Sequence, residues 1–388
     1  ADVAPHAGRD YAAGRNYDDQ THVSVLSPYL RHRIITEQEV LTAVLRHHTP
    51  SAAEKFIAEV CWRTYWKGWL ERRPTLWAGY QAELRKTLDD VQTQSGLRSE
   101  WEAACLGQTG IACFDHWAQE LVTTGYLHST AHVWFASIWR PTLQLPWPLG
   151  AYFFMRHLLD GDAAPNTLSW RWVGGIQPMG KSYLARADNI ARYTHGRFTP
   201  TGLAHHPYPL DTAPHPPVGP VPQSDWIDPA KSSVHLITDD DIAATQPDMP
   251  TATYYNAAGR SPLATAPMIG EFVDPALTGH GPALADVDAI TAWAVDQGAQ
   301  QLVMNYTPVG PTADGLRGLR AALDAQGIIL AVHIRDHDRN GRPAAKAGIL
   351  KLKAVVPDTL RLVAESPEPQ HGPASPRKAV PLHTPQPT

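Results

Sequence analysis

The chain has 388 residues, the length of two or three typical domains, and its hydrophobic fraction of 43% excludes disorder throughout. Three cysteines cannot build a disulfide framework or an iron–sulfur cluster, and their sparse use indicates a reducing, cytoplasmic compartment. The net charge of −5 excludes a protein that coats duplex DNA through overall positive charge.

Residues 1–196 read as helices. Apolar residues from Phe56 to Tyr65 recur at helical spacing, and the segment 117–139 favours a helix that is interrupted near Gly125. Three Ser/Thr-x-x-Glu patterns predict helix starts, at Thr36–Glu39, Ser51–Glu54 and Ser99–Glu102. Eleven of the thirteen tryptophans lie before residue 180, and such a density either fills a core or lines a site for a flat ligand.

The segment 197–230 contains nine prolines, which exclude a helix or a central strand. We expect an extended linker or a strap along the surface. Beyond it, segments 234–238, 302–305 and 328–334 predict the central strands of a parallel sheet, with helices at 284–298 and 313–326. A small α/β domain over residues 231–365 and a disordered tail at 366–388 are therefore expected. No phosphate-binding glycine motif accompanies the strands.

Four segments carry a resemblance to a known family. They are Tyr11 with Ser24–Leu30; Phe56–Arg63; Thr109–Asp115 with Thr124–His128; and Leu159–Asn166 with Ser169–Trp172. In this order and near this spacing they resemble the motifs of the photolyase/cryptochrome family over residues 10–195. The resemblance implies an all-α FAD-binding domain of photolyase/cryptochrome type over 1–196, followed here by the small α/β domain.

The resemblance implies a FAD site. Its residues would be Tyr11, Ser24, Val25, Leu26, Ser27, Arg63, Tyr126, Ser129, His132, Asp160, Asp162 and Asn166. Hydroxyls where a loop turns into a helix suit a phosphate, although Ser24 and Ser27 also fit ordinary helix caps. Asp160 and Asp162 would lie near the ribityl chain and ring, and Asn166 at the flavin N5 edge, whereas in isolation these polar groups fit a solvated loop.

Two further groups of residues follow from the resemblance. Trp170 and then Trp147 would relay electrons to the flavin, whereas core packing is the alternative for both. The third position of that relay is Gln94 here, and Trp139, Trp134 and Trp101 are open substitutes. Glu59, Trp62 and Trp172 would hold a DNA lesion flipped out of its strand, whereas a surface Glu59–Arg63 ion pair is the alternative for the first.

The third motif departs from the family. Tyr126 replaces a usual Trp, and the residues Ser129, His132 and Val133 match neither the cyclobutane-dimer nor the six-four repair class. His132 stands where an Arg normally pairs with the counterpart of Asp160. Because histidine can form that pair only when protonated, the resemblance implies a pH-sensitive flavin environment.

The order of the parts also departs from the family, in which an α/β antenna domain precedes the flavin domain. Segments 299–306 and 347–353 are loosely similar to the second half of that antenna domain. The α/β segment is thus either a permuted relic or an unrelated domain, and whether it holds a second chromophore stays open.

The leading hypothesis is a FAD-dependent, blue-light-driven photolyase-like lyase that transfers an electron to a pyrimidine dimer in damaged DNA, either single-stranded or with the dimer flipped out. The rival is a cryptochrome-like photoreceptor without repair activity, and a redox or scaffold flavoprotein is a third reading. We expect no metal site and no membrane segment, since no apolar stretch approaches 18 residues. Protein partners stay open.

Overall fold

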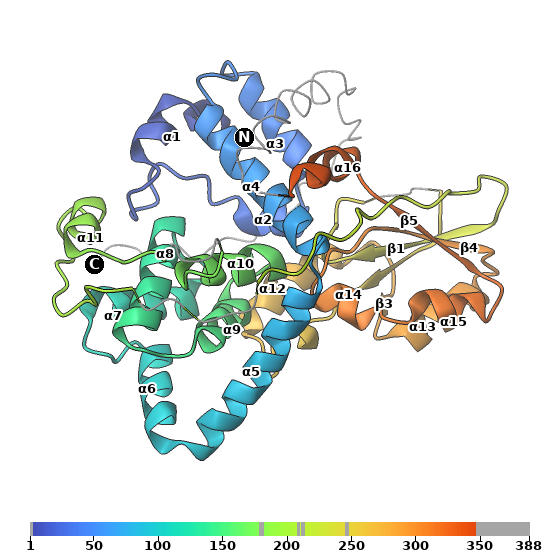
Figure 1. Ribbon diagram of the computed structural model, residues 1–388. Coiled ribbons are helices and arrows are strands. Elements are labelled where there is room, and N and C mark those ends of the chain that lie inside the picture. The colour runs from blue at the N-terminus through green and yellow to red at the C-terminus, as the bar shows by residue number, and fades with distance from the viewer. Residues whose placement is uncertain (1–2, 178–181, 208–209, 211–213, 245–247, 347–388) are drawn as a thin grey trace.

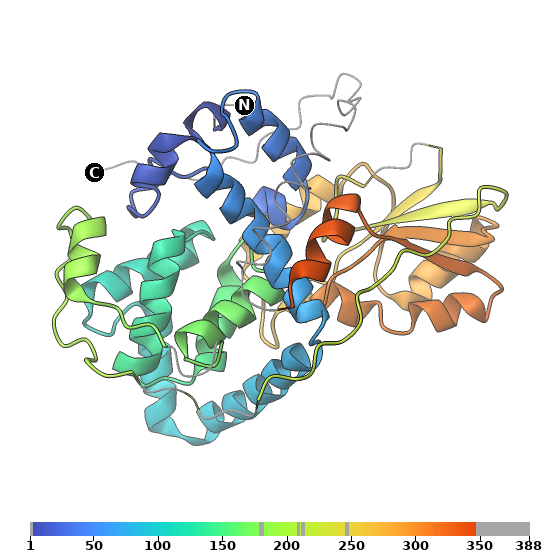
Figure 2. The ribbon, with the colours of Figure 1, turned by 45° about the horizontal axis from the view of Figure 1, so that its top comes forward.

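The computed structural model describes residues 3–177, 182–207, 210, 214–244 and 248–346 (Figure 1). Helices form one part of the molecule, and a parallel sheet with its own helices forms the other (Figures 1 and 2). Among the described residues, no helix is both long and apolar enough to cross a bilayer. The segment 347–353 and the expected tail at 366–388 lie outside the described residues.

Every regular element before residue 230 in the described residues is a helix. After a 3-10 turn at Ala4–His6, these are α1 (Arg9–Gly14), α2 (Ser27–Arg31), α3 (Glu37–Leu45), α4 (Glu54–Glu71), α5 (Thr75–Thr93), α6 (Ser95–Leu106), α7 (Ala112–Thr124), α8 (Ser129–Ser137), a π-helix (Ile138–Thr142), α9 (Trp147–His157), α10 (Ala163–Val173) and α11 (Ala187–Tyr193). Their shared core is rich in aromatic side chains, among them Trp117, Trp134 and Trp139.

One of the three expected capping boxes forms. The Thr36 hydroxyl accepts from the Glu39 backbone N–H, and the Glu39 carboxylate accepts from that of Thr36. The predictions of the other two capping boxes are wrong. A turn in which Thr49 accepts from Ala52 N–H delays the start of α4, and Ser99 lies inside α6. The expected break near Gly125 is present, because this residue ends α7 with φ 66°.

The parallel sheet expected from the sequence is confirmed, with the order β3-β2-β1-β4-β5. Its strands are β1 (Ser233–Thr238), β2 (Thr251–Tyr254), β3 (Ala283–Leu284), β4 (Gln301–Asn305) and β5 (Ile329–His333). The prediction that β5 is central was wrong, because β5 pairs only with β4 and forms an edge. The sequence analysis missed β2 and β3, which are short.

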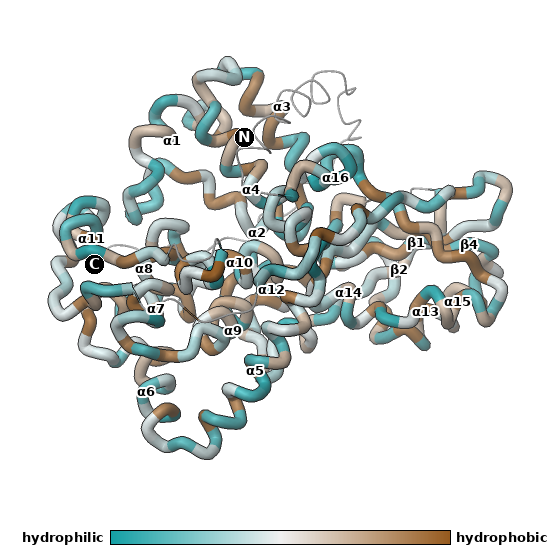
Figure 3. Tube along the Cα trace, in the orientation of Figure 1, coloured by the Kyte–Doolittle hydropathy of each residue, from teal (hydrophilic) through white to brown (hydrophobic). Residues whose placement is uncertain are grey.

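Helices cover both faces of this sheet. Val234 and Leu236 of β1 pack in one core with α13 (Val287–Asp296) and α15 (Leu319–Asp324). Ile237 points the opposite way and packs against α12 (Pro267–Leu277). This alternation follows from the two-residue period of a strand, and hydrophobic residues accordingly mark β1 and β4 in Figure 3. The remaining elements are α14 (Pro311–Gly315), α16 (Asp336–Gly341), and 3-10 turns at Ala258–Arg260 and Arg342–Ala344.

The proline-rich segment contains neither helix nor strand in its described residues. The Gly219 N–H donates to the carbonyl of Arg72 at the end of α4. Farther on, Asp225 N–H donates to the carbonyl of Val332, and its carboxylate accepts from the Val332 N–H. The segment therefore covers part of the exposed edge of β5, which would otherwise present unpaired backbone groups.

Side chains of α2 and of the segment after it join the two parts. Tyr29 and Phe272 make an edge-to-face contact with ring centroids 5.3 Å apart. Arg33 adopts φ 45°, a left-handed conformation that is unfavourable for a residue with a Cβ. Its buried guanidinium reaches Glu37 at 3.2 Å and Asp338 at 2.7 Å, and these ion pairs offset the backbone cost.

We predict that Phe272→Ala destabilises the protein by about 3–5 kcal/mol, because it empties a buried site between α12 and α2. The control Leu106→Ala, at a side chain that is 59% exposed, should change the free energy of unfolding by no more than about 0.5 kcal/mol. Urea unfolding measures both. Equal losses for the two variants would contradict the packing described.

Candidate functional site

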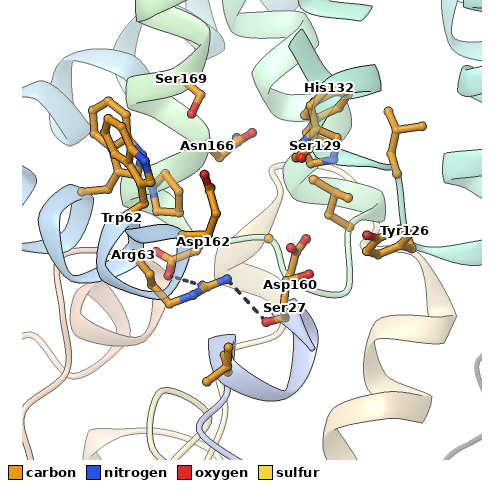
Figure 4. Close-up of a pocket in the computed structure, with 18 of the residues that line it drawn as sticks. Ser27, Trp62, Arg63, Tyr126, Ser129, His132, Asp160, Asp162, Asn166 and Ser169 are labelled. Atoms are coloured by element: carbon orange, nitrogen blue, oxygen red, sulfur yellow. Dashed lines mark hydrogen bonds and ion pairs between the residues drawn. The ribbon is translucent and has the colours of Figure 1, made fainter. Parts of the chain in front are cut away.

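A cavity of about 580 Å³ opens between α1, α2, α4, α8 and α10. Its volume lies within the range of ~300–1,000 Å³ that is common for ligand pockets. Apart from Trp147, every site residue predicted from the sequence lines it. These are Tyr11, Ser24, Val25, Leu26, Ser27, Glu59, Trp62, Arg63, Tyr126, Ser129, His132, Asp160, Asp162, Asn166, Trp170 and Trp172. Figure 4 shows many of them converging from separate helices.

The residues Ser24–Ser27 form one wall of the cavity. Val25 has φ 51°, and the Ser24 hydroxyl accepts from the Leu26 N–H at 3.4 Å. Leu26, not either serine, is the N-cap of α2, and it makes no side-chain cap. The alternative that these serines are ordinary helix caps is therefore wrong, and their contact with a phosphate stays a prediction.

Asp162 is the most strongly paired carboxylate of the cavity (Figure 4). It lies 3.2 Å from Arg63 Nη1 and 3.3 Å from Lys67 Nζ, and it caps α10 by accepting from the Ala164 N–H. Although Asp162 is buried, Lys67, Arg31 and Arg63 hold its pKa well below the usual range. It is therefore a fixed negative charge, and Arg63 is held in place by it.

Glu59 does not pair with Arg63. It forms a close ion pair with Arg15 of α1, so the alternative of a surface Glu59–Arg63 pair is wrong. Burial and the Glu59 charge raise the pKa of the neighbouring Tyr11 to about 12. Tyr11, Arg15 and Glu59 thus form a polar rim on the α1–α4 side of the cavity.

Asn166 has a defined orientation on α10. Its Nδ2 donates to the backbone carbonyl of Ala151 in α9 at 2.8 Å. That bond uses one of the two Nδ2 hydrogens, so the second hydrogen can donate to a ligand and the amide oxygen can accept from one.

His132 lies on α8, with its ring centroid 4.9 Å from that of Phe154. Its Nε2 is buried and has no hydrogen-bond partner among the described residues. Burial lowers the pKa of His132, while Asp160 acts in the opposite direction. The ring is therefore neutral near pH 7, and it does not supply the cation that the family places beside this aspartate.

Two half-buried tryptophans, Trp62 of α4 and Trp172 of α10, line the cavity. Trp62 stacks on Trp66 with ring centroids 5.3 Å apart, and Trp172 stacks on Tyr183 at 5.7 Å. A neighbouring ring restrains each indole, so each presents a preformed flat surface that is suited to stacking on a planar ligand.

The tryptophans proposed for a relay have different surroundings. Trp170 lines the cavity, and its Nε1 has no partner among the described residues. Its ring touches Trp139 edge-on at 6.0 Å, which favours Trp139 over Trp134 and Trp101 as its neighbour. Trp147 lies outside the cavity lining, where its Nε1 donates to Glu83 and its ring packs on Tyr80.

Sequence reasoning missed three cations of the site. Lys67 lies four residues after Arg63, so the helical period could have placed it on the same face. Arg15 follows Tyr11 at the same spacing. Arg31 carries no such signal, because its partners Asp239 and Asp240 lie more than 200 residues away.

Comparisons with known proteins find similarity over the helical part of the chain. Residues 56–198 match the model of the FAD-binding domain of DNA photolyase. A deoxyribodipyrimidine photo-lyase of Vibrio cholerae is 26% identical over 206 residues, which are 50% of this chain and 41% of the relative. That of Synechococcus is 27% identical over 232 residues (52% and 47%), and that of Thermus thermophilus 31% over 172 residues (43% and 38%).

Residues 56–198 of the helical part are thus similar to the FAD-binding domain of DNA photolyase, and the curated relatives that match the chain are deoxyribodipyrimidine photo-lyases. The chain spans less than half the length of these curated relatives. Among solved structures, a class III photolyase from Agrobacterium tumefaciens aligns with a TM-score of 0.37 and 24% identity, over 44% of this chain and 35% of that one.

We predict that His132 makes stability depend on pH. Its folded pKa is lowered, so its contribution is fully present above the unfolded pKa of about 6.5 and is lost as the pH falls from there towards the folded pKa. His132→Asn should therefore flatten the fall in unfolding free energy between pH 7.5 and 5, as measured by urea titration. An identical slope in the wild type and the variant would contradict this, and exposed His205→Asn is the control.

Proposed function

We propose that the cavity binds FAD. Three observations support a fit: the cavity is large enough for an extended ligand, its walls are mostly apolar and aromatic, and its polar groups converge from separate elements. Buried Trp170 Nε1 and His132 Nε2, which lack partners among the described residues, are further support, because buried polar atoms normally have them. Ser24 and Ser27 would face the phosphates, and Asn166 Oδ1 would accept from the flavin ring.

We further propose that the protein is a photolyase-like enzyme that uses blue light to repair a pyrimidine dimer in DNA. Bound FAD would supply an electron donor that absorbs visible light. The chain's own residues do the rest: Trp62 and Trp172 stack on the extruded bases, and Glu59, which is paired with Arg15, accepts hydrogen bonds from them. The observation that carries the proposal is that these three residues line the same cavity as the proposed flavin site.

A second candidate is a cryptochrome-like photoreceptor that does not repair DNA. The observation that favours it is the neutral His132, whose buried Nε2 has no partner among the described residues, together with Ser129 and Val133 at the same rim. In this reading Trp170 and Trp147 serve photoreduction, and the aromatic walls bind no lesion. Either protein would act in a reducing compartment such as the cytoplasm, as the few cysteines indicate.

The decisive test is repair of a defined cyclobutane dimer in a single-stranded oligonucleotide under blue light, with the visible spectrum of the protein recorded in parallel. Repair that requires both light and bound FAD supports the enzyme. A flavin spectrum without repair supports the photoreceptor instead of the enzyme. Purified protein that takes up no FAD refutes both proposed functions.

We predict that Trp170→Phe slows flavin photoreduction in the presence of an external reductant, because phenylalanine is much harder to oxidise than tryptophan. Trp147→Phe should slow it as well, and Trp139→Phe should do so if the relay branches through the ring contact at 6.0 Å. The control is Trp117→Phe, in the core and outside the cavity lining. Photoreduction by Trp170→Phe at the wild-type rate would exclude Trp170 from the relay.

We predict that Trp62→Ala and Trp172→Ala each weaken binding of a dimer-containing strand by about 5- to 150-fold, the equivalent of ~1–3 kcal/mol for one base stack. Replacement of an exposed charge, as in Arg192→Ala, should cost less and fade at higher salt. Fluorescence anisotropy on damaged and undamaged strands measures all three. Equal weakening on both kinds of strand would mean that the walls do not recognise the lesion.

A further inference from the structure

The carboxyl end of the sheet is filled by side chains of the helical part. In doubly wound sheets, ligands bind at the carboxyl ends of two neighbouring strands whose following connections run in opposite directions. Here these two strands are β1 and β4. Asp239, Asp240 and Asp241 follow β1 directly and are all buried. Instead of facing a ligand, they meet Arg31 and Arg33, which come from α2 and the residues after it.

Arg31 connects this end of the sheet to the floor of the cavity. Its Nη1 donates to Asp240 at 2.6 Å and its Nη2 to Asp239 at 3.4 Å. On the other side, its Nε donates to the carbonyl of Gly161 at 3.1 Å and lies 3.9 Å from Asp162 Oδ2. Arg31 does not line the cavity, whereas Gly161 and Asp162 do. One buried guanidinium thus lies between two carboxylates of the sheet and one of the cavity.

The loop before α10, residues 158–162, is held at two further points. His32 Nδ1 lies 2.8 Å from the carbonyl oxygen of Asp239, and its Nε2 lies 3.2 Å from that of Leu159. Arg260, beyond β2, donates to the carbonyl of Leu158 at 2.7 Å. A Cβ on Gly161 would lie 2.2 Å from Arg260 Nη2, so the fit there suits glycine. The α/β part therefore supports the loop that carries Asp160 and Asp162.

We propose that Asp240, with Asp239, positions Arg31 and balances its charge, and that the α/β part thereby sets the electrostatic potential of the flavin cavity. This inference rests on the proposed binding of FAD. Asp240 is a positioning residue, because it acts through Arg31 and does not touch the cavity. The effect is strong over these distances because all the groups are buried and screened little by solvent.

The sign of the effect distinguishes this role from a purely structural one. In Asp240→Asn, the Arg31 charge is less balanced, so the cavity becomes more positive and the midpoint potential of bound flavin should rise. In Arg31→Gln, the cavity loses a positive charge, and the potential should fall. If the residues only kept the fold intact, both variants would shift the potential in the same direction or leave it unchanged.

The experiment compares flavin midpoint potentials, measured against a reference dye at pH 8, for the wild type, Asp240→Asn and Arg31→Gln. Asp240→Glu and Arg31→Lys, which keep the charges, should stay near the wild type. Asp225→Asn removes a carboxylate from a surface pair with Arg320 and is the matched control. Opposite shifts support the proposal, and equal or absent shifts overturn it. If Asp240→Asn fails to fold, the pair Arg31→Gln and Arg31→Lys decides, and equal potentials for that pair overturn it.

A second measurement needs no flavin. Backbone amides of Leu159 and Gly161 donate to carbonyls of Gly125 and Leu158, so their hydrogen exchange reports on how firmly the loop is held. In the apo-protein, Asp240→Asn and Arg31→Gln should speed this exchange, whereas Asp225→Asn should not. Wild-type protein that binds no FAD would refute the proposed function, while unchanged exchange in both variants would refute the support of the loop.

Discussion

The arrangement of this molecule depends on the ion pairs and hydrogen bonds that the buried guanidinium of Arg31 makes with both parts of the chain. A buried arginine is costly unless carboxylates and carbonyls surround it, and Arg31 has Asp239, Asp240 and Gly161 as such partners. Two of these partners belong to the α/β part and one to the cavity loop. Removing Arg31 would leave the buried carboxylates of Asp239 and Asp240 without their cation, and removing the carboxylates would leave Arg31 without its anions. The two parts of the chain therefore depend on each other.

This dependence explains how the α/β part, although it follows the helical part in the chain, can support the cavity of the helical part. The carboxyl end of the parallel sheet, which commonly receives a ligand, is used here to hold α2 and the loop before α10. The cavity then takes its polar floor from this loop and its flat walls from α4 and α10. The proposed flavin chemistry would thus use a scaffold that includes both parts.

Local rules predicted those features that a few neighbouring residues decide. The Thr36 capping box and the glycine break at Gly125 are of this kind, and each of the four motifs contributes some residues to one cavity, although none of Thr109–Asp115 in the third motif lines it. The edge position of β5 was missed because strand order depends on where the chain crosses the sheet, which no single segment encodes. Ser51 was mistaken for a helix cap because a turn begun at Thr49 competes with it.

Charges that act over long sequence separations were the main omission. Arg31 and Asp240 are 209 residues apart, and each alone resembles an ordinary surface charge. Even within α4, the sequence suggested a Glu59–Arg63 pair, whereas both side chains turn to partners on other elements, Arg15 and Asp162. Tertiary packing decides between such partners, because only burial makes one pairing much stronger than another.

A crystal structure of the protein with bound FAD, obtained by soaking or co-purification, would show where the flavin lies relative to Arg31 and the cavity. We expect the flavin ring beside Asn166 Oδ1 and Asp160 in the cavity, the phosphates beside Ser24 and Ser27, and Arg31 still bound to Asp239 and Asp240. FAD found at the carboxyl end of the sheet, with Arg31 displaced from these aspartates, would contradict this expectation.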